Sequence, residues 1–66
     1  MIDINALKGE IVKHGYSQAE VATKIGIAPK TFYEKMKRGV FGSDEIQVMI
    51  EILCIDDPAA IFFVRG

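Results

Sequence analysis

Hydrophobic residues recur along the chain at helical spacing, and short breaks divide them into five stretches. In the first stretch, Ile4, Leu7 and Ile11 are three and four residues apart, which places them on one face of a helix. Gly15 follows, and a glycine just beyond the last turn is typical of a helix C-terminus. The pattern therefore predicts a helix over residues 3–14.

A capping box marks the start of the second stretch. Ser17 is followed three residues later by Glu20, so the Ser17 hydroxyl can accept from the Glu20 N–H while the Glu20 carboxylate accepts from the Ser17 N–H. Tyr16 and Val21 flank the cap as a hydrophobic staple. These signals predict a helix over residues 17–25.

The third stretch predicts a basic helix over residues 29–38. Gly26 ends the helix before it, and Pro29 is favoured at a first helical position, where its missing N–H would have no partner in any case. Phe32 and Met36, four residues apart, are its inward-facing apolar residues. Such a narrow apolar stripe leaves a wide polar face exposed.

The fourth stretch fits two interpretations, of which a helix over residues 43–54 is favoured. Ser43 is expected to cap this helix, with acidic residues in the first turn, where the helix dipole favours them. The β-branched residues of 46–52 also alternate as in a strand. The alternation breaks at Met49, and the cap favours the helix.

Asp57 followed by Pro58 is a further cap and first-turn signal, which predicts a short helix over residues 58–64. The predicted fold is therefore an all-α bundle of five helices. A chain of 66 residues is expected to form a single domain, 1–66. With 50% hydrophobic and 26% charged residues, it is too apolar for a disordered chain.

The cysteine and histidine content excludes several classes of site. One cysteine, Cys54, cannot form a disulfide within the chain, and with the single His14 it is too little for a structural zinc site. Cys54 is expected to be a small buried residue and His14 a helix C-terminal residue. No phosphate-cradling glycine loop or catalytic pairing is recognisable, so we expect neither a cofactor nor an enzyme.

The chain is expected to be cytoplasmic and without a membrane span. Its N-terminus lacks the basic and apolar regions of a secretory signal. Its longest apolar stretch, 46–55, is interrupted by Gln47 and Glu51 and is about half the roughly 20 residues that a membrane-spanning helix needs.

Charge is distributed unevenly along the chain. The net charge is −1, but residues 1–42 carry seven Lys and Arg against four acids, giving +3, whereas residues 43–66 carry one against five, giving −4. The densest basic cluster is Lys30 to Arg38, on the predicted third helix. Two short helices joined across Gly26, the second of them basic, are typical of a DNA-binding helix-turn-helix.

Residues 17–32, Ser-Gln-Ala-Glu-Val-Ala-Thr-Lys-Ile-Gly-Ile-Ala-Pro-Lys-Thr-Phe, resemble the phage repressor and Cro type of helix-turn-helix, also called the lambda repressor-like or xenobiotic-response-element family. The first predicted helix and residues 55–63 extend the resemblance over nearly the whole chain. It implies a lambda repressor-like bundle and a sequence-specific regulator of transcription that binds double-stranded DNA. A phage or prophage repressor is the expected setting. Ala28 departs from the family, which usually has a Ser-like cap there.

The resemblance also implies which residues contact DNA. Gln18 would anchor a phosphate and brace the third helix, and residues 30, 33 and 34 would face base edges. Position 29 would face a base edge as well, but it holds a proline, which has no polar side chain. Positions 31, 37 and 38 would contact the phosphate backbone of the DNA. The candidate DNA-contacting residues are Gln18, Pro29, Lys30, Thr31, Tyr33, Glu34, Lys37 and Arg38.

Base and phosphate chemistry agrees with most of these roles. Lys30 can donate to guanine O6 or N7, and Glu34 can accept from cytosine N4. Lys37 and Arg38 can neutralise phosphates and release counterions. A purely structural alternative is a solvated helix face on which Glu34 pairs with a neighbouring lysine.

Two kinds of protein partner remain open. The apolar C-terminal third, with Ile61-Phe62-Phe63-Val64, has a hydrophobic surplus that favours a homodimer. The overall acidity also permits a second function on the same scaffold. In that alternative the chain is a protein-interaction module, such as an antitoxin or an antirepressor-like adaptor.

Overall fold

The computed structural model describes residues 1–64, which form five α-helices and no strand. The predicted all-α class is therefore confirmed, and the β-branched stretch 46–52 is helical. The fourth and fifth helices end two residues earlier than predicted. The helices are α1 (Ile4–Lys13), α2 (Gln18–Ile25), α3 (Pro29–Arg38), α4 (Ser43–Ile52) and α5 (Pro58–Phe62).

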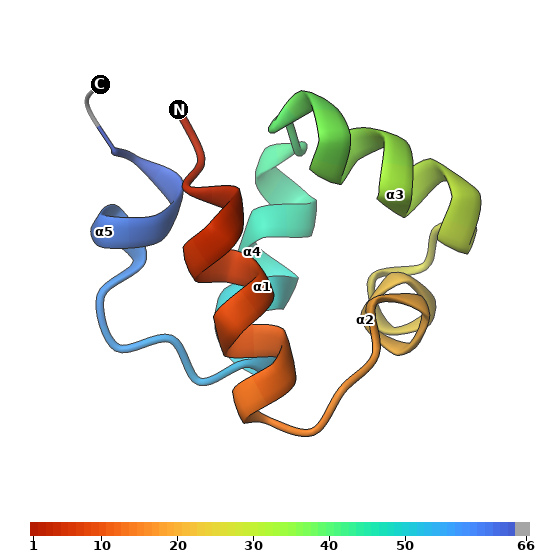
Figure 1. Ribbon diagram of the computed structural model, residues 1–66, viewed down its shortest axis with the longest axis horizontal. Coiled ribbons are helices and arrows are strands. Elements are labelled where there is room, and N and C mark those ends of the chain that lie inside the picture. The colour runs from red at the N-terminus through yellow and green to blue at the C-terminus, as the bar shows by residue number, and fades with distance from the viewer. Residues whose placement is uncertain (65–66) are drawn as a thin grey trace.

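The helices are arranged around a central pair, as Figure 1 shows. In that view α1 and α4 occupy the middle, α2 and α3 lie to one side, and α5 lies at the opposite end of the longest axis. Helix α2 packs against α3 and α4, and α1 packs against α5. Because α2 is seen end-on while α3 lies across the view, the two helices cross each other (Figure 1).

One hydrophobic core joins all five helices. Phe32 of α3 is fully buried, and its ring lies 5.4 Å from that of Phe41, centroid to centroid. None of the described residues buries a polar or charged side chain. The buried side chains are Leu7, Ile11, Val21, Ala22, Phe32, Met36, Phe41, Met49, Leu53, Ile55, Ile61 and Phe62.

Two local predictions are wrong. Gly42, not Ser43, is the N-cap of α4, because the Glu45 carboxylate accepts from the Gly42 N–H at 2.7 Å and draws Ser43 into the first turn. Cys54 is exposed instead of buried. It lies just past the C-cap of α4 with φ at +47°, in the left-handed turn that ends the helix, and this turn directs it out of the core.

The two ends of the described chain lie together. The Asp3 N–H donates to the Ile61 carbonyl at 2.7 Å, and the Val64 N–H donates to the Met1 carbonyl at 3.0 Å. These bonds join the segment before α1 to the segment around the end of α5. The α5 end of the molecule is therefore closed by backbone hydrogen bonds between residues far apart in sequence.

Candidate nucleic-acid interface

The connection between α2 and α3 is formed by the signals that predicted it. The Ser17 hydroxyl accepts from the Glu20 N–H at 3.1 Å, and the Glu20 carboxylate accepts from the Ser17 N–H at 2.9 Å, which confirms the capping box. At the other end of α2, Gly26 adopts φ +94°, a left-handed conformation that glycine enters at no steric cost. The chain then passes through two residues into α3, so the two helices are joined by a tight turn.

Helix α3 begins without a side-chain cap. Ala28 occupies the N-cap position in an extended conformation, and no side chain accepts from the first-turn N–H groups there. Pro29 stands at the first helical position, as predicted. Since the first-turn N–H groups of a helix point outward along its axis, this end of α3 offers uncapped donors to an anionic ligand.

Helix α3 buries a narrow stripe and exposes the rest of its surface. Phe32 and Met36 are its two buried residues, as the sequence predicts. Tyr33 is 49% exposed, with its ring edge-on to that of Phe32 at 6.5 Å between centroids. Seven of the eight candidate DNA-contacting residues lie together on this exposed surface, and they are Pro29, Lys30, Thr31, Tyr33, Glu34, Lys37 and Arg38.

Gln18, the eighth candidate, lies at a different place. It is the first residue of α2 and is half-buried. A basic residue that was not among the candidates lies near the other end of α2, where the Lys24 ammonium is 5.4 Å from the centre of the Tyr16 ring. An aromatic face attracts a cation at this distance, so Lys24 is held against the protein.

One cation of α3 is neutralised within the protein. The Lys35 ammonium donates to both carboxylate oxygens of Glu45, at 2.7 and 2.6 Å. The Lys35 and Glu45 side chains are 33% and 14% exposed. Four cations and one carboxylate give α3 a charge of +3, and Glu45 lowers the local charge to +2. The basic field around α3 is therefore weaker than the sequence alone implies.

The same carboxylate ties α3 to the beginning of α4. Burial raises the pKa of Glu45, but the hydrogen bonds from Lys35 and the Gly42 N–H, together with the Lys35 charge, outweigh burial and lower that pKa below its ordinary value of 4.5. Glu45 is therefore ionised at neutral pH and holds both partners. The Gly42 contact has a signal in the sequence, a glutamate at the third helical position. Lys35 is ten residues away and has none.

The remaining charged side chains of α3 are free of ion pairs within residues 1–64. The two ion pairs in this part of the chain are Lys35–Glu45 and a looser Lys13–Glu10 contact at 3.9 Å. The alternative in which Glu34 pairs with a neighbouring lysine is therefore not observed. Lys30, Lys37 and Arg38 are likewise exposed, and no carboxylate of residues 1–64 pairs with them.

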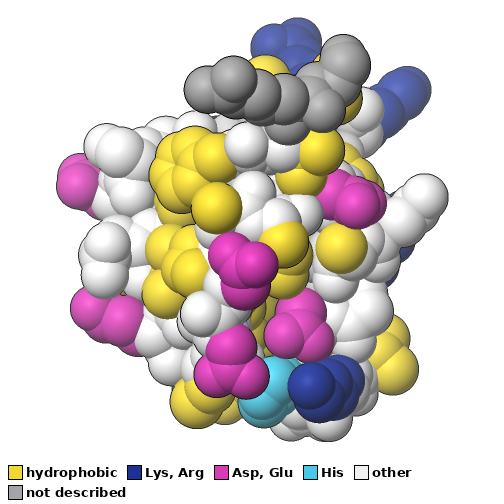
Figure 2. Space-filling model, turned by 90° about the vertical axis from the view of Figure 1, so that its left-hand side faces the viewer, with side chains coloured by type: hydrophobic (Ala, Val, Ile, Leu, Met, Phe, Trp, Pro, Cys, Tyr) yellow, Lys and Arg dark blue, Asp and Glu magenta, His cyan; other side chains and the backbone are white. Residues whose placement is uncertain are grey.

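Several acidic side chains lie on the side of the molecule opposite α3. Figure 2 shows the α5 side, which lies opposite α3 in Figure 1, and acidic side chains are spread over it between hydrophobic ones. Most of the Lys and Arg side chains in this view lie toward the rim (Figure 2). A polyanion that approaches α3 is therefore remote from these side chains, but it meets the first turn of α4, where Asp44 lies beside the Lys35–Glu45 pair.

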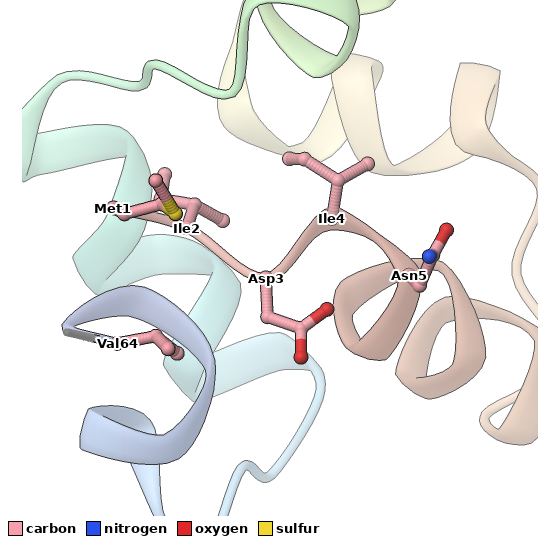
Figure 3. Close-up of a pocket in the computed structure, with 6 residues that line it drawn as sticks. All are labelled: Met1, Ile2, Asp3, Ile4, Asn5 and Val64. Atoms are coloured by element: carbon pink, nitrogen blue, oxygen red, sulfur yellow. The ribbon is translucent and has the colours of Figure 1, made fainter. Parts of the chain in front are cut away.

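Other kinds of site have little support in the described part of the chain. Residues 1–64 contain no group of three or more His, Cys, Asp or Glu side chains placed to hold a metal ion. None of the five helices has the length and apolar character needed to cross a membrane. A shallow open hollow lies between the two chain ends, lined by Met1, Ile2, Asp3, Ile4, Asn5 and Val64 (Figure 3).

The carboxylate of Asp3 in this hollow already has a structural role. It accepts from the Ala6 N–H at 3.0 Å and caps α1. The one charged side chain that lines the hollow is therefore used as a helix cap, and α3 is the better candidate site. Comparisons with known protein families, with curated proteins and with solved structures found no match for this chain.

Proposed function

We propose that the protein binds double-stranded DNA through the exposed surface of α3 and acts in the cytoplasm as a sequence-specific transcriptional regulator, of the phage or prophage repressor type. One observation carries the proposal. Helix α3 buries two side chains and exposes an aromatic ring, one carboxylate and three cations that form no ion pair with residues 1–64. An α-helix with its side chains is about 10–12 Å across, so the 10-residue α3 can enter a major groove that is about 12 Å wide.

Each exposed residue has a role in this arrangement. Lys30 donates to guanine, and Tyr33 and Glu34 meet neighbouring base edges. Pro29 also lies at the groove, without a polar group to offer. Phosphates are contacted by the cations at the far end of α3 and by the hydroxyl and amide groups near the turn. These phosphate-contacting residues are Gln18, Thr31, Lys37 and Arg38.

Fluorescence anisotropy with a labelled random duplex, measured over a series of salt concentrations, tests the proposal. We expect the double variant Lys37→Ala/Arg38→Ala to bind more weakly and to reduce the slope of log affinity against log salt by about 2, because each phosphate contact contributes about one unit. The matched control Lys8→Ala/Lys13→Ala removes the same charge from exposed positions of α1. Absence of binding by the wild type, or an equal loss in both variants, would contradict the proposal.

A homodimer through the C-terminal third is part of the proposal. Most of the apolar surplus is used by the core, but Phe63 remains 62% exposed beside the end of α5. Helix α3 lies at the other end of an axis 28 Å long (Figure 1). Two copies joined at their α5 ends therefore span at most about 56 Å, so their α3 helices can reach the roughly 34 Å that separates successive major grooves.

The alternative is a protein-interaction module, for which the mixed acidic and apolar surface on the α5 side is the supporting feature (Figure 2). In that case the chain is an antitoxin or an antirepressor-like adaptor, and its target is a protein instead of DNA. Loss of partner binding in Phe63→Ser, with full partner binding in Lys37→Ala/Arg38→Ala, would favour this alternative.

A further inference from the structure

Lys35 is the cation of α3 to which the proposed function gives no DNA contact. At 3.6 residues per turn, it lies about 80° around the helix from the midpoint of the buried Phe32 and Met36, so it borders the exposed surface. Its neighbours one helical turn away are Thr31 and Arg38, and both are proposed phosphate contacts. The ammonium group of Lys35 therefore belongs to a row of side chains placed to meet phosphates.

A carboxylate of the protein holds this ammonium group. Lys35 donates to both oxygens of Glu45, at 2.7 and 2.6 Å, and Oε1 of Glu45 also accepts from the Gly42 N–H at 2.7 Å. A carboxylate and a DNA phosphate both offer anionic oxygens that form charge-assisted hydrogen bonds with an ammonium group. Glu45 therefore supplies to Lys35 the contact that a phosphate would otherwise supply.

The two members of the pair differ in how firmly they are held. The Glu45 side chain is 14% exposed and is anchored to the start of α4 by the Gly42 N–H, whereas the Lys35 side chain is 33% exposed. A lysine carries its charge on a flexible aliphatic chain, so its ammonium group can turn outward when the carboxylate no longer holds it. Lys35 is thus kept from an approaching duplex by a single charged partner and not by burial.

We propose that Lys35 is a latent phosphate-binding residue of α3, and that Glu45 lowers the affinity of the protein for DNA by holding its ammonium group. This inference rests on the proposed DNA-binding function. The pairing removes one phosphate contact from every duplex, whatever its sequence, and leaves the base contacts of α3 unchanged. Glu45 therefore acts on affinity and not on sequence preference.

Fluorescence anisotropy with a labelled random duplex, over a series of salt concentrations, tests the inference on Glu45→Gln. A glutamine can still accept from the Gly42 N–H, but it has no charge with which to hold the ammonium group. We expect Glu45→Gln to bind more tightly than the wild type and to steepen the slope of log affinity against log salt by about 0.9, the increment of one phosphate contact. Its advantage in affinity then grows about threefold as the salt concentration falls from about 200 to about 50 mM.

Lys35→Ala distinguishes a released lysine from the mere loss of a negative charge. We expect it to reduce the slope by about 0.9 in the Glu45→Gln background and to leave the slope unchanged in the wild-type background, because only the released ammonium group contacts DNA. The control Asp44→Asn removes a neighbouring negative charge from the first turn of α4. Within residues 1–64 Asp44 forms no ion pair with Lys35, so this control is expected to keep the wild-type slope.

Circular dichroism verifies that each variant is folded. If the wild type binds duplex but Glu45→Gln keeps its slope, or if Lys35→Ala reduces the slope equally in both backgrounds, the inference is wrong and the proposed function stands. Should Glu45→Gln not fold, the wild type and Lys35→Ala still decide, since a lower slope for Lys35→Ala means that Lys35 already contacts DNA. If neither the wild type nor Glu45→Gln binds duplex at any salt concentration, the proposed function fails and the inference fails with it.

Discussion

Ala28 begins α3 without a side chain that can accept from the first-turn N–H groups. A serine hydroxyl at an N-cap stabilises a helix by about 1 kcal/mol relative to alanine. We therefore expect Ala28→Ser to raise the free energy of unfolding by about 1 kcal/mol, measured by urea denaturation. The matched substitution Ala59→Ser, inside α5, supplies a hydroxyl away from an N-cap. An equal effect of the two substitutions would contradict the capping explanation.

Two glycines differ in the reason for their presence. Gly26 has φ +94°, whereas Gly9 lies within α1, where an added methyl group meets nothing within 4 Å. We expect Gly26→Ala to lower the free energy of unfolding by about 1 kcal/mol or more, because an L-residue is strained in the left-handed conformation. Gly9→Ala is expected to raise it by up to about 1 kcal/mol through helix propensity. Thermal denaturation measures both, and effects of the same sign would contradict this distinction.

At the scale of the helices, the Lys35–Glu45 contact joins α3 to α4. The pKa of Glu45 is lowered in the folded protein, so this contact contributes stability above pH 4.5 that is lost as the pH falls through the folded-state pKa. We expect Glu45→Gln to be less stable than the wild type at pH 7. The difference in unfolding free energy should shrink as the pH falls below 4.5, because the glutamine does not titrate.

Urea denaturation at a series of pH values measures this difference. Glu51→Gln, on the same helix, is the matched control for the loss of one negative charge at an exposed position. The difference in unfolding free energy between Glu45→Gln and the wild type could instead stay constant from pH 7 to pH 3. That result would show that ionisation of the Glu45 carboxylate does not stabilise the fold.

The ends of the helices could be predicted from the sequence where they are determined by residues close together in the chain. The Ser17–Glu20 box, the glycine at position 26 and the proline at position 29 act over three or four residues, so their effect is visible without a fold. The start of α4 was assigned to Ser43 because a serine hydroxyl is a stronger cap signal than a glycine. The structure instead uses Gly42 with the Glu45 side chain.

The candidate site was predictable only in part. The buried stripe of Phe32 and Met36 follows from spacing, so the exposed surface of α3 could be derived before the structure. The pairing of Lys35 with Glu45 could not be predicted from the sequence, because it depends on how α3 and α4 pack against each other across the loop between them. The exposure of Cys54 depends on a left-handed turn after α4 that hydrophobicity alone does not reveal.

At the scale of the whole molecule, the proposed dimer depends on the α5 end. We expect Phe63→Ser to shift the protein toward monomer in sedimentation equilibrium, because Phe63 is a large apolar side chain left exposed next to α5. The control Val12→Ser changes another exposed apolar residue, on α1. A monomeric wild type, or equal dissociation of both variants, would contradict the proposed interface.

The separation of charge also has a consequence at this scale. Among residues 1–64, Lys30, Lys37 and Arg38 of α3 form no ion pair, and acidic side chains are scattered between hydrophobic ones on the opposite α5 side (Figure 2). A duplex is therefore expected to approach from one direction only. That direction places the outer surface of α3, and not the joined chain ends, against the DNA.

Amide chemical-shift mapping during titration of the protein with a duplex shows which surface of the protein meets the DNA. We predict that the largest shifts fall on residues 30–38 and on Gln18, while α5 and the segment before α1 change little. Shifts concentrated on α5, or no shifts at low salt, would contradict the assignment of α3 as the surface that meets DNA.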